Sequence, residues 1–184
     1  MNELVLKAKS GNNDAFDELI VKIEKEMYLI AKSKLSNDDD IADAIQDAIL
    51  AIYKNIHKLR DISLFKTWAI KILLNKCNKL YKKNKNNNVS LEDNDIEKYI
   101  GYEQNYDEDV SFDLLISNLN SDERLILTLY YYSGYTVKEI SKIIRKNENT
   151  IKSKLLRAKG KLKKFLKENG IDARYWENIK KFYQ

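Results

Sequence analysis

The sequence has 184 residues, with no proline and only five glycines. Proline breaks helices, and glycine destabilises them by roughly 0.5–1 kcal/mol relative to alanine. The scarcity of both therefore favours an almost entirely helical chain. Hydrophobic residues make up 43% of the sequence, which is enough for packed cores and argues against wholesale disorder. The length fits one ordinary domain or two small ones.

The chain also has a single cysteine, Cys77, and a single histidine, His57. One cysteine excludes an internal disulfide framework, and one histidine with one cysteine excludes the usual zinc-ligand sets. The sequence lacks a Gly-rich phosphate-binding loop as well, so it has little equipment for catalysis. We therefore expect no metal site, no cofactor and no enzymatic activity.

Long apolar segments are missing too. The first thirty residues hold no uninterrupted apolar stretch of the kind found in secretory signals. No run approaches the roughly eighteen apolar residues that indicate a membrane-spanning helix. We therefore expect no membrane insertion and a cytoplasmic protein.

The formal net charge of +5 is distributed unevenly along the chain. Residues 1–88 carry +4, residues 89–120 carry −8 and residues 121–184 carry +9. An acidic middle between two basic ends predicts two domains and a connector, although simple solvation also explains an acidic segment. We place helical domains at 1–88 and 112–184 and an acidic flexible linker at 89–111. No role is assigned to the tail, residues 168–184.

Hydrophobic periodicity predicts helices in both halves and no strand of useful length, so the fold class is all-α. In the first half we expect helices at residues 2–8, 13–34, 40–56 and 64–83. Asn13 or Asp14 would cap the second of these helices, and a residue from 36–38 would cap the third. The asparagine run after residue 83 is expected to end the fourth, because Asn is a poor helix former. In the second half we expect helices at 112–118, 121–132, 137–144 and 147–166.

The last two of these helices have the layout of a helix-turn-helix. Thr136 can cap the first, residues 145–148 form the turn, and Ile151 is placed to fill the angle between the helices. The second helix is rich in Lys and Arg, and its apolar residues fall within about a 100° arc. On the opposite face, Asn149 and Ser153 are short enough to reach base edges, with cations behind them for phosphates. We interpret it as a DNA-recognition helix, with a solvated Lys-rich surface as the alternative.

The same part of the chain carries a family resemblance. The segment "LNSDERLILTLYYYSGYTVKEISKIIRKNENTIKSKLLRAKGKL" resembles the promoter-recognising C-terminal domain of bacterial sigma factors. The matching residues are Glu123, Arg124, Gly134, Thr136, Glu139, Ile140, Ser141, Thr150, Ile151, Lys152, Ser153, Leu155, Arg157 and Ala158. The turn departs from the common pattern, because Arg145 and Lys146 stand where Gly and an apolar residue are usual.

The first half resembles the same family independently. "DIADAIQDAILAIYKNI" is similar to its polymerase-binding helix, and "LFKTWAIKILLNKCNKLYKK" is similar to the helix that follows. The matching residues are Asp40, Asp43, Gln46, Asp47, Phe65, Lys66, Thr67, Trp68 and Asn75. Lys79 departs from the pattern, since the family often has Asp there. The two motifs occur in the family's order on a short chain. In this the chain resembles the extracytoplasmic-function group of sigma factors.

The resemblance implies a sigma factor that binds core RNA polymerase, directs it to promoter DNA and assists melting. Asp43, Gln46 and Asp47 would bind the polymerase. The minus-ten element would contact His57, Arg60, Ser63, Lys66, Lys71, Asn75, Lys79 and Lys82. The minus-thirty-five element would contact Arg145, Asn147, Asn149, Thr150, Lys152, Ser153, Lys154, Arg157 and Lys161. An anti-sigma factor is the further expected partner. The alternative is a two-domain helix-turn-helix regulator that does not bind core polymerase.

Overall fold

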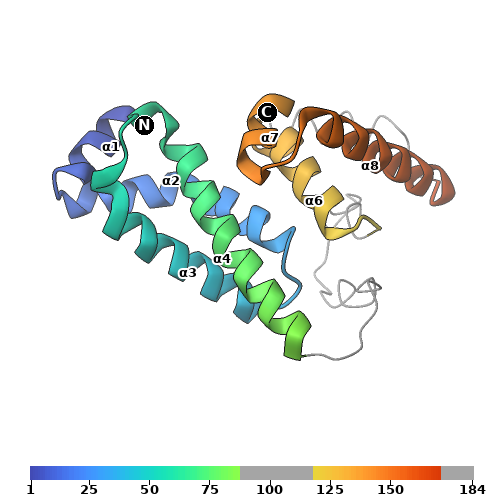
Figure 1. The fold of residues 1–184 in the computed structure, drawn as a ribbon, viewed down its shortest axis with the longest axis horizontal. Coiled ribbons are helices and arrows are strands. Elements are labelled where there is room, and N and C mark those ends of the chain that lie inside the picture. The colour runs from blue at the N-terminus through green and yellow to red at the C-terminus, as the bar shows by residue number, and fades with distance from the viewer. Residues whose placement is uncertain (88–117, 171–184) are drawn as a thin grey trace. The chain divides into compact units, whose positions relative to one another are not determined.

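The computed structural model describes residues 1–87 and 118–170, apart from the side chains of residues 85–87. Within these ranges the fold is all-α, as the periodicity predicts (Figure 1). The chain divides into two compact units, residues 1–87 and 88–184. The linker expected at 89–111 and most of the helix expected at 112–118 lie outside the described residues. None of the described helices combines the length and apolarity that crossing a bilayer requires.

The first unit consists of four α-helices and two short 3₁₀ turns. They are α1 (Asn2–Lys9), α2 (Asn13–Lys32), α3 (Asp38–Asn55), η1 (Ile56–Lys58), η2 (Ile62–Leu64) and α4 (Phe65–Asn87). Helices α2, α3 and α4 pack against one another, and α1 packs against α2 and both 3₁₀ turns. The core contains fully buried side chains from all three long helices, among them Ile23, Ile52 and Leu73. Each contributes about 1.5–3 kcal/mol of burial free energy.

Asparagine side chains begin two helices of this unit. Asn12, and neither Asn13 nor Asp14, caps α2, because its Oδ1 accepts the N–H of Ala15 at 2.8 Å. That expectation was wrong by one residue. Asn37 caps α3 in the same way, within the range expected from the sequence.

Helix α4 continues past the position where we expected it to end. It extends to Asn87, so Asn84, Asn86 and Asn87 are part of the helix and do not stop it at residue 83. Asn84 donates a hydrogen bond from Nδ2 to Oδ2 of Asp40 at 2.6 Å, which joins the end of α4 to the first turn of α3. Tertiary contact outweighs the weak helix propensity of Asn here.

Within residues 118–170, the described part of the second unit contains α6 (Ser121–Leu127), the π-helical turn η4 (Thr128–Tyr132), α7 (Val137–Ile144) and α8 (Glu148–Glu168). The helix expected at 121–132 therefore changes to π geometry over its last five residues. Reciprocal capping boxes begin α6 and α7, between Asn120 and Glu123 and between Thr136 and Glu139. Helix α8 packs against α6 and α7.

Candidate nucleic-acid interface

The turn between α7 and α8 has the geometry of a helix-turn-helix. Arg145 ends α7 in the left-handed conformation, with φ 56°. The N–H of Lys146 donates to the carbonyl of Ser141 at 3.1 Å. The left-handed conformation costs a residue with a side chain about 1 kcal/mol, which explains why Gly is usual at this position. The arginine keeps the turn tight in spite of this cost.

Asn147 then begins α8. Its Oδ1 accepts the backbone N–H of Thr150 at 2.7 Å and the hydroxyl of the same residue at 2.9 Å. Ile151 is fully buried, as expected for the residue that fills the angle between the helices.

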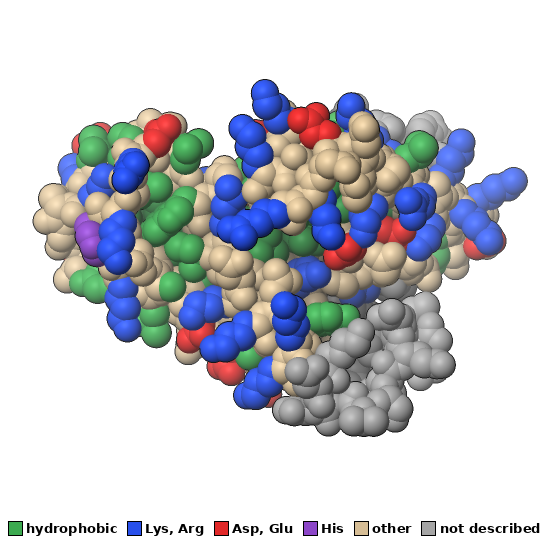
Figure 2. Space-filling view, viewed as in Figure 1, with side chains coloured by type: hydrophobic (Ala, Val, Ile, Leu, Met, Phe, Trp, Pro, Cys, Tyr) green, Lys and Arg blue, Asp and Glu red, His purple; other side chains and the backbone are tan. Residues whose placement is uncertain are grey.

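The two sides of α8 differ sharply in exposure. Its buried residues are Ile151, Leu155, Ala158, Leu162 and Leu166, which is the apolar arc expected from the sequence with the half-buried Phe165 beside it. On the other side Asn149, Lys152, Arg157 and Gly160 are exposed, and Ser153 is half-buried. Figure 2 shows Lys and Arg side chains on the visible face of both units, the second included. The exposed side of α8 is therefore cationic and accessible from solvent.

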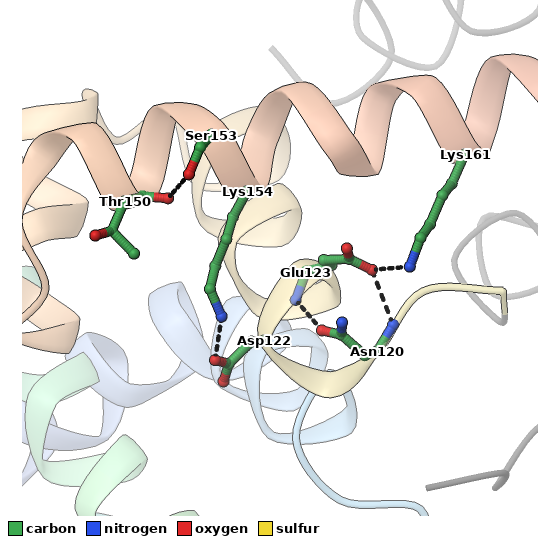
Figure 3. Close-up of polar contacts among 7 residues, drawn as sticks. All are labelled: Asn120, Asp122, Glu123, Thr150, Ser153, Lys154 and Lys161. Atoms are coloured by element: carbon green, nitrogen blue, oxygen red, sulfur yellow. Dashed lines mark hydrogen bonds and ion pairs between the residues drawn. The ribbon is translucent and has the colours of Figure 1, made fainter.

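Two lysines that we expected on the DNA-facing side point instead toward α6 (Figure 3). Nζ of Lys154 lies 2.5 Å from Oδ2 of Asp122, and Nζ of Lys161 lies 2.8 Å from Oε2 of Glu123. Glu123 is only 4% exposed. Both lysines lie at the border of the apolar arc, where a long flexible side chain can extend to either side. We therefore assign them to the contact between α8 and α6 and withdraw them from the candidate DNA contacts.

The candidate minus-ten residues of the first unit fall on a loop and on α4. His57 lies in η1, and His57, Arg60 and Ser63 are all exposed. The N–H and hydroxyl of Ser63 donate to Oδ1 of Asp61, and these bonds lower the pKa of that carboxyl. The ammonium of Lys9 donates to the carbonyl of Leu59, so α1 fixes the middle of the loop.

The candidate residues on α4 differ in accessibility. Asn75, Lys79 and Lys82 are exposed and Lys71 is half-buried. Lys66 is held at 2.9 Å from the buried carboxylate of Glu26, on α2. Trp68 is half-buried against Phe65, with ring centroids 6.2 Å apart.

The candidate polymerase-binding residues share one side of α3. Asp43, Gln46 and Asp47 are all exposed. Oδ2 of Asp47 also lies 3.1 Å from Nζ of Lys76 on α4. Leu50, one turn further along α3, is 55% exposed and extends the same surface.

No metal-binding or reactive thiol chemistry is indicated in the described ranges. None of the described His, Cys, Asp and Glu side chains form a group of three or more that could hold a metal ion. Cys77 is buried, and loss of solvation raises the pKa of its thiol to about 12. A thiol with so high a pKa is a poor nucleophile at neutral pH.

Sequence reasoning left two residues out of the candidate sets. Leu156 lies on the exposed side of α8 and is 73% exposed. The helical period places it there, but an apolar residue was not counted as a DNA contact. Lys9 contacts a residue fifty positions away in the chain, and nothing in the local sequence indicates that contact.

Comparison with known families finds matches in both units. Residues 19–87 match the family model described as sigma-70 region 2, and residues 109–162 match the model described as sigma-70, region 4. The first match covers α3, α4 and the loop between them. The second covers the helix-turn-helix.

The chain is also similar to individual proteins, and its fold is similar to solved structures. The chain is 25% identical over 153 residues to the RNA polymerase sigma factor SigV of Bacillus subtilis, covering 83% of this chain and 92% of that protein. It is 22% identical over 165 residues to the ECF RNA polymerase sigma factor SigM of Mycobacterium tuberculosis, covering 89% and 83%. The fold resembles CnrH in complex with the cytosolic domain of CnrY, with TM-score 0.65 and 21% identity, covering 91% and 97%. It also resembles RpoE of Bartonella quintana in complex with the anti-sigma factor NepR, with TM-score 0.64 and 20% identity, covering 83% and 96%.

Proposed function

Because the chain belongs to the sigma-70 family of RNA polymerase sigma factors, in its extracytoplasmic-function group, we propose that it binds core RNA polymerase and directs it to specific promoters. It assists melting of the promoter and catalyses no reaction itself. It acts in the cytoplasm, with residues 1–88 and 112–184 as its two functional domains and 89–111 as the connector.

The match of residues 19–87 to region 2 carries this proposal. A helix-turn-helix alone is shared by many transcription regulators, so the second unit does not separate the two candidate functions. A regulator that does not bind polymerase needs no polymerase-binding helix in its first unit. The region 2 match therefore favours the sigma factor over the alternative regulator.

The exposed side of α8 is the surface we propose for the minus-thirty-five element. Arg145, Lys152 and Arg157 are exposed cations that can neutralise phosphates, and Asn149 and Ser153 are short polar side chains within reach of bases. Asn147 keeps its amide available as a donor, because its two bonds to Thr150 are both accepted by Oδ1. Binding by such a surface weakens steeply as salt concentration rises.

We propose that the loop of residues 57–64 and the exposed cations of α4 act on the minus-ten element. Removing a base from the stack costs a few kcal/mol, and contacts to the extruded base offset that cost. Arg60 and Ser63 are exposed on the loop, and Lys79 and Lys82 are exposed on the helix that follows. The cations Arg60, Lys79 and Lys82 can hold the phosphate backbone of the separated strand.

The exposed side of α3 is the surface we propose for core polymerase. Asp43, Gln46 and Asp47 offer carboxylate and amide groups on a rigid helix, which suits a basic partner surface. An anti-sigma factor is a further proposed partner, since two proteins of similar fold were solved in complex with CnrY and with the anti-sigma factor NepR.

Assembly of the holoenzyme tests the polymerase-binding part of the proposal. The variant with Gln46→Ala and Asp47→Asn should fail to co-elute with core polymerase while keeping its helical circular dichroism. Asp47→Asn also removes the ion pair with Lys76, so Lys76→Met is the matched control. Lys76→Met breaks the same pair, leaves the α3 surface intact and should bind normally. Normal co-elution of the folded double variant would contradict the assignment of this surface.

A further inference from the structure

The exposed side of α8 contains one large apolar residue, Leu156. It is 73% exposed, more than any other large hydrophobic side chain in the described ranges. Single exposed hydrophobic residues are common on protein surfaces and need no explanation by themselves. Leu156 differs by its position, because it lies between the exposed cations Lys152 and Arg157 on the surface proposed for DNA.

Ser153, one turn before Leu156, has a restricted hydrogen-bonding capacity. Its Oγ donates to the carbonyl of Thr150 at 3.0 Å, within the same helix (Figure 3). The hydroxyl hydrogen is therefore engaged, and only the lone pairs of Oγ can bind a further group. A side chain that accepts but does not donate selects for a donor on the partner.

Each of these two side chains matches a different group in the major groove. The donors exposed there are the exocyclic amino groups of adenine and cytosine, and the one apolar group is the 5-methyl of thymine. Residues three apart on a helix are neighbours on one face, separated along the axis by about 4.5 Å. That separation is close to the base-pair spacing of about 3.4 Å.

We propose that Ser153 and Leu156 read neighbouring base pairs of the minus-thirty-five element. Ser153 accepts a hydrogen bond from the amino group of adenine or cytosine, and Leu156 packs on the methyl group of thymine. This inference rests on the proposed function. It adds the bases that the recognition surface selects, and it includes Leu156, which charge and polarity alone leave out.

The test uses holoenzyme assembled from the full chain and core polymerase. A preferred sequence is first selected from double-stranded promoter DNA randomised in the minus-thirty-five region. Each thymine of that sequence is then replaced by deoxyuridine, which removes the methyl group and nothing else. At one position the wild type should lose about fourfold in affinity, the equivalent of one buried methyl group.

Variants assign that loss to a side chain. Leu156→Ala should bind thymine and deoxyuridine equally, and Leu156→Met, which keeps an apolar side chain, should restore the discrimination. The matched control is Val21→Ala, an exposed apolar residue of α2 at 63% exposure that has no proposed role. It should discriminate as the wild type does.

The amino-group contact is tested in the same way. At the neighbouring positions, adenine is replaced by unsubstituted purine, or cytosine by 2-pyrimidinone, and each replacement removes the exocyclic amino group. The wild type should lose about fivefold at one of them, and Ser153→Ala should show no such loss.

Three results would overturn the inference. They are a selected sequence without thymine in either strand, equal wild-type binding to every deoxyuridine substitution, and a Leu156→Ala variant that still discriminates. In each of these cases a preferred sequence is selected, so the proposed function stands. Failure of the holoenzyme to assemble or to select any sequence would instead refute the proposed function, and this inference with it.

Discussion

The ammonium of Lys161 lies 2.8 Å from Oε2 of Glu123, and this ion pair joins α8 to α6. The same carboxylate oxygen accepts the N–H of Asn120 in the capping box that begins α6. Glu123 is 4% exposed, so its charge has little access to water. The pair therefore links the start of one helix to the side of the recognition helix.

Replacing Lys161 should destabilise the second unit and leave promoter binding almost unchanged. Lys161→Met leaves a buried carboxylate without its cation, which should cost about 1–3 kcal/mol. Hydrogen–deuterium exchange of peptides from α6 and α8 measures this loss. The control is Lys163→Met, an exposed lysine on the same helix, which should leave exchange unchanged. A drop of about one in the salt slope of promoter binding for Lys161→Met would return this lysine to the DNA contacts.

Arg145 should show opposite effects on stability and on DNA binding. Its φ of 56° is strained for a residue with a side chain, so Arg145→Gly should stabilise the second unit by about 1 kcal/mol. The same change removes an exposed cation from the proposed DNA surface and should lower the salt slope of promoter binding by about one. Arg145→Ala is the matched control, because it loses the cation and keeps the strain. Equal stability of the Gly and Ala variants would contradict the role of strain in this turn.

Lys9 should affect promoter melting without affecting assembly with polymerase. Lys9→Met removes the hydrogen bond to the carbonyl of Leu59 and should loosen residues 57–64. Permanganate reactivity of minus-ten thymines should fall, while co-elution with core polymerase stays normal. Lys7→Met is the control on the same helix, since Lys7 pairs with Glu3 on the exposed surface of α1. Equal permanganate reactivity for wild type and Lys9→Met would show that α1 does not support the loop.

Glu139 should make the stability of the second unit depend on pH in acid. The hydroxyl of Thr136 donates to the Glu139 carboxylate at 2.7 Å, and its N–H donates at 2.8 Å. These bonds lower the pKa of Glu139 from its ordinary value of 4.5. A lowered pKa means that the stabilisation is complete above the unfolded pKa and is lost as pH falls through the folded pKa.

The free energy of unfolding of wild type minus that of Glu139→Gln should therefore be constant above about pH 5.5 and shrink below about pH 4.5. Urea denaturation followed by circular dichroism at a series of pH values measures this difference. Effects of the other carboxyl groups are common to both proteins and cancel. A difference that stays constant down to pH 3 would contradict the assignment.

The parts of the fold set by local pattern could be predicted from the sequence. The helices follow the apolar periodicity, and Asn37, Thr136 and Ile151 have the positions that capping and spacing predict. The extension of α4 could not be predicted, because it is accompanied by a contact between Asn84 and Asp40, forty-four positions apart.

In the candidate interfaces, too, the sequence predicts the features set by local pattern and not those set by contacts between distant residues. The periodicity identifies which residues lie opposite the apolar arc of α8, and these are exposed in the structure except Ser153, which is half-buried. It does not determine the direction of a lysine at the border of the arc. Lys154 and Lys161 extend toward α6 because Asp122 and Glu123 are there, and the sequence of α8 contains no information about those carboxylates.

Run-off transcription tests the central claim most directly. Core polymerase is incubated with fragments of the host genome, including the region upstream of the protein's own gene, with and without the full chain. We predict transcripts with discrete start sites that require the chain and that are lost with the Gln46→Ala, Asp47→Asn variant. DNA binding by the chain without any chain-dependent transcript would contradict the assignment as a sigma factor and favour the helix-turn-helix regulator.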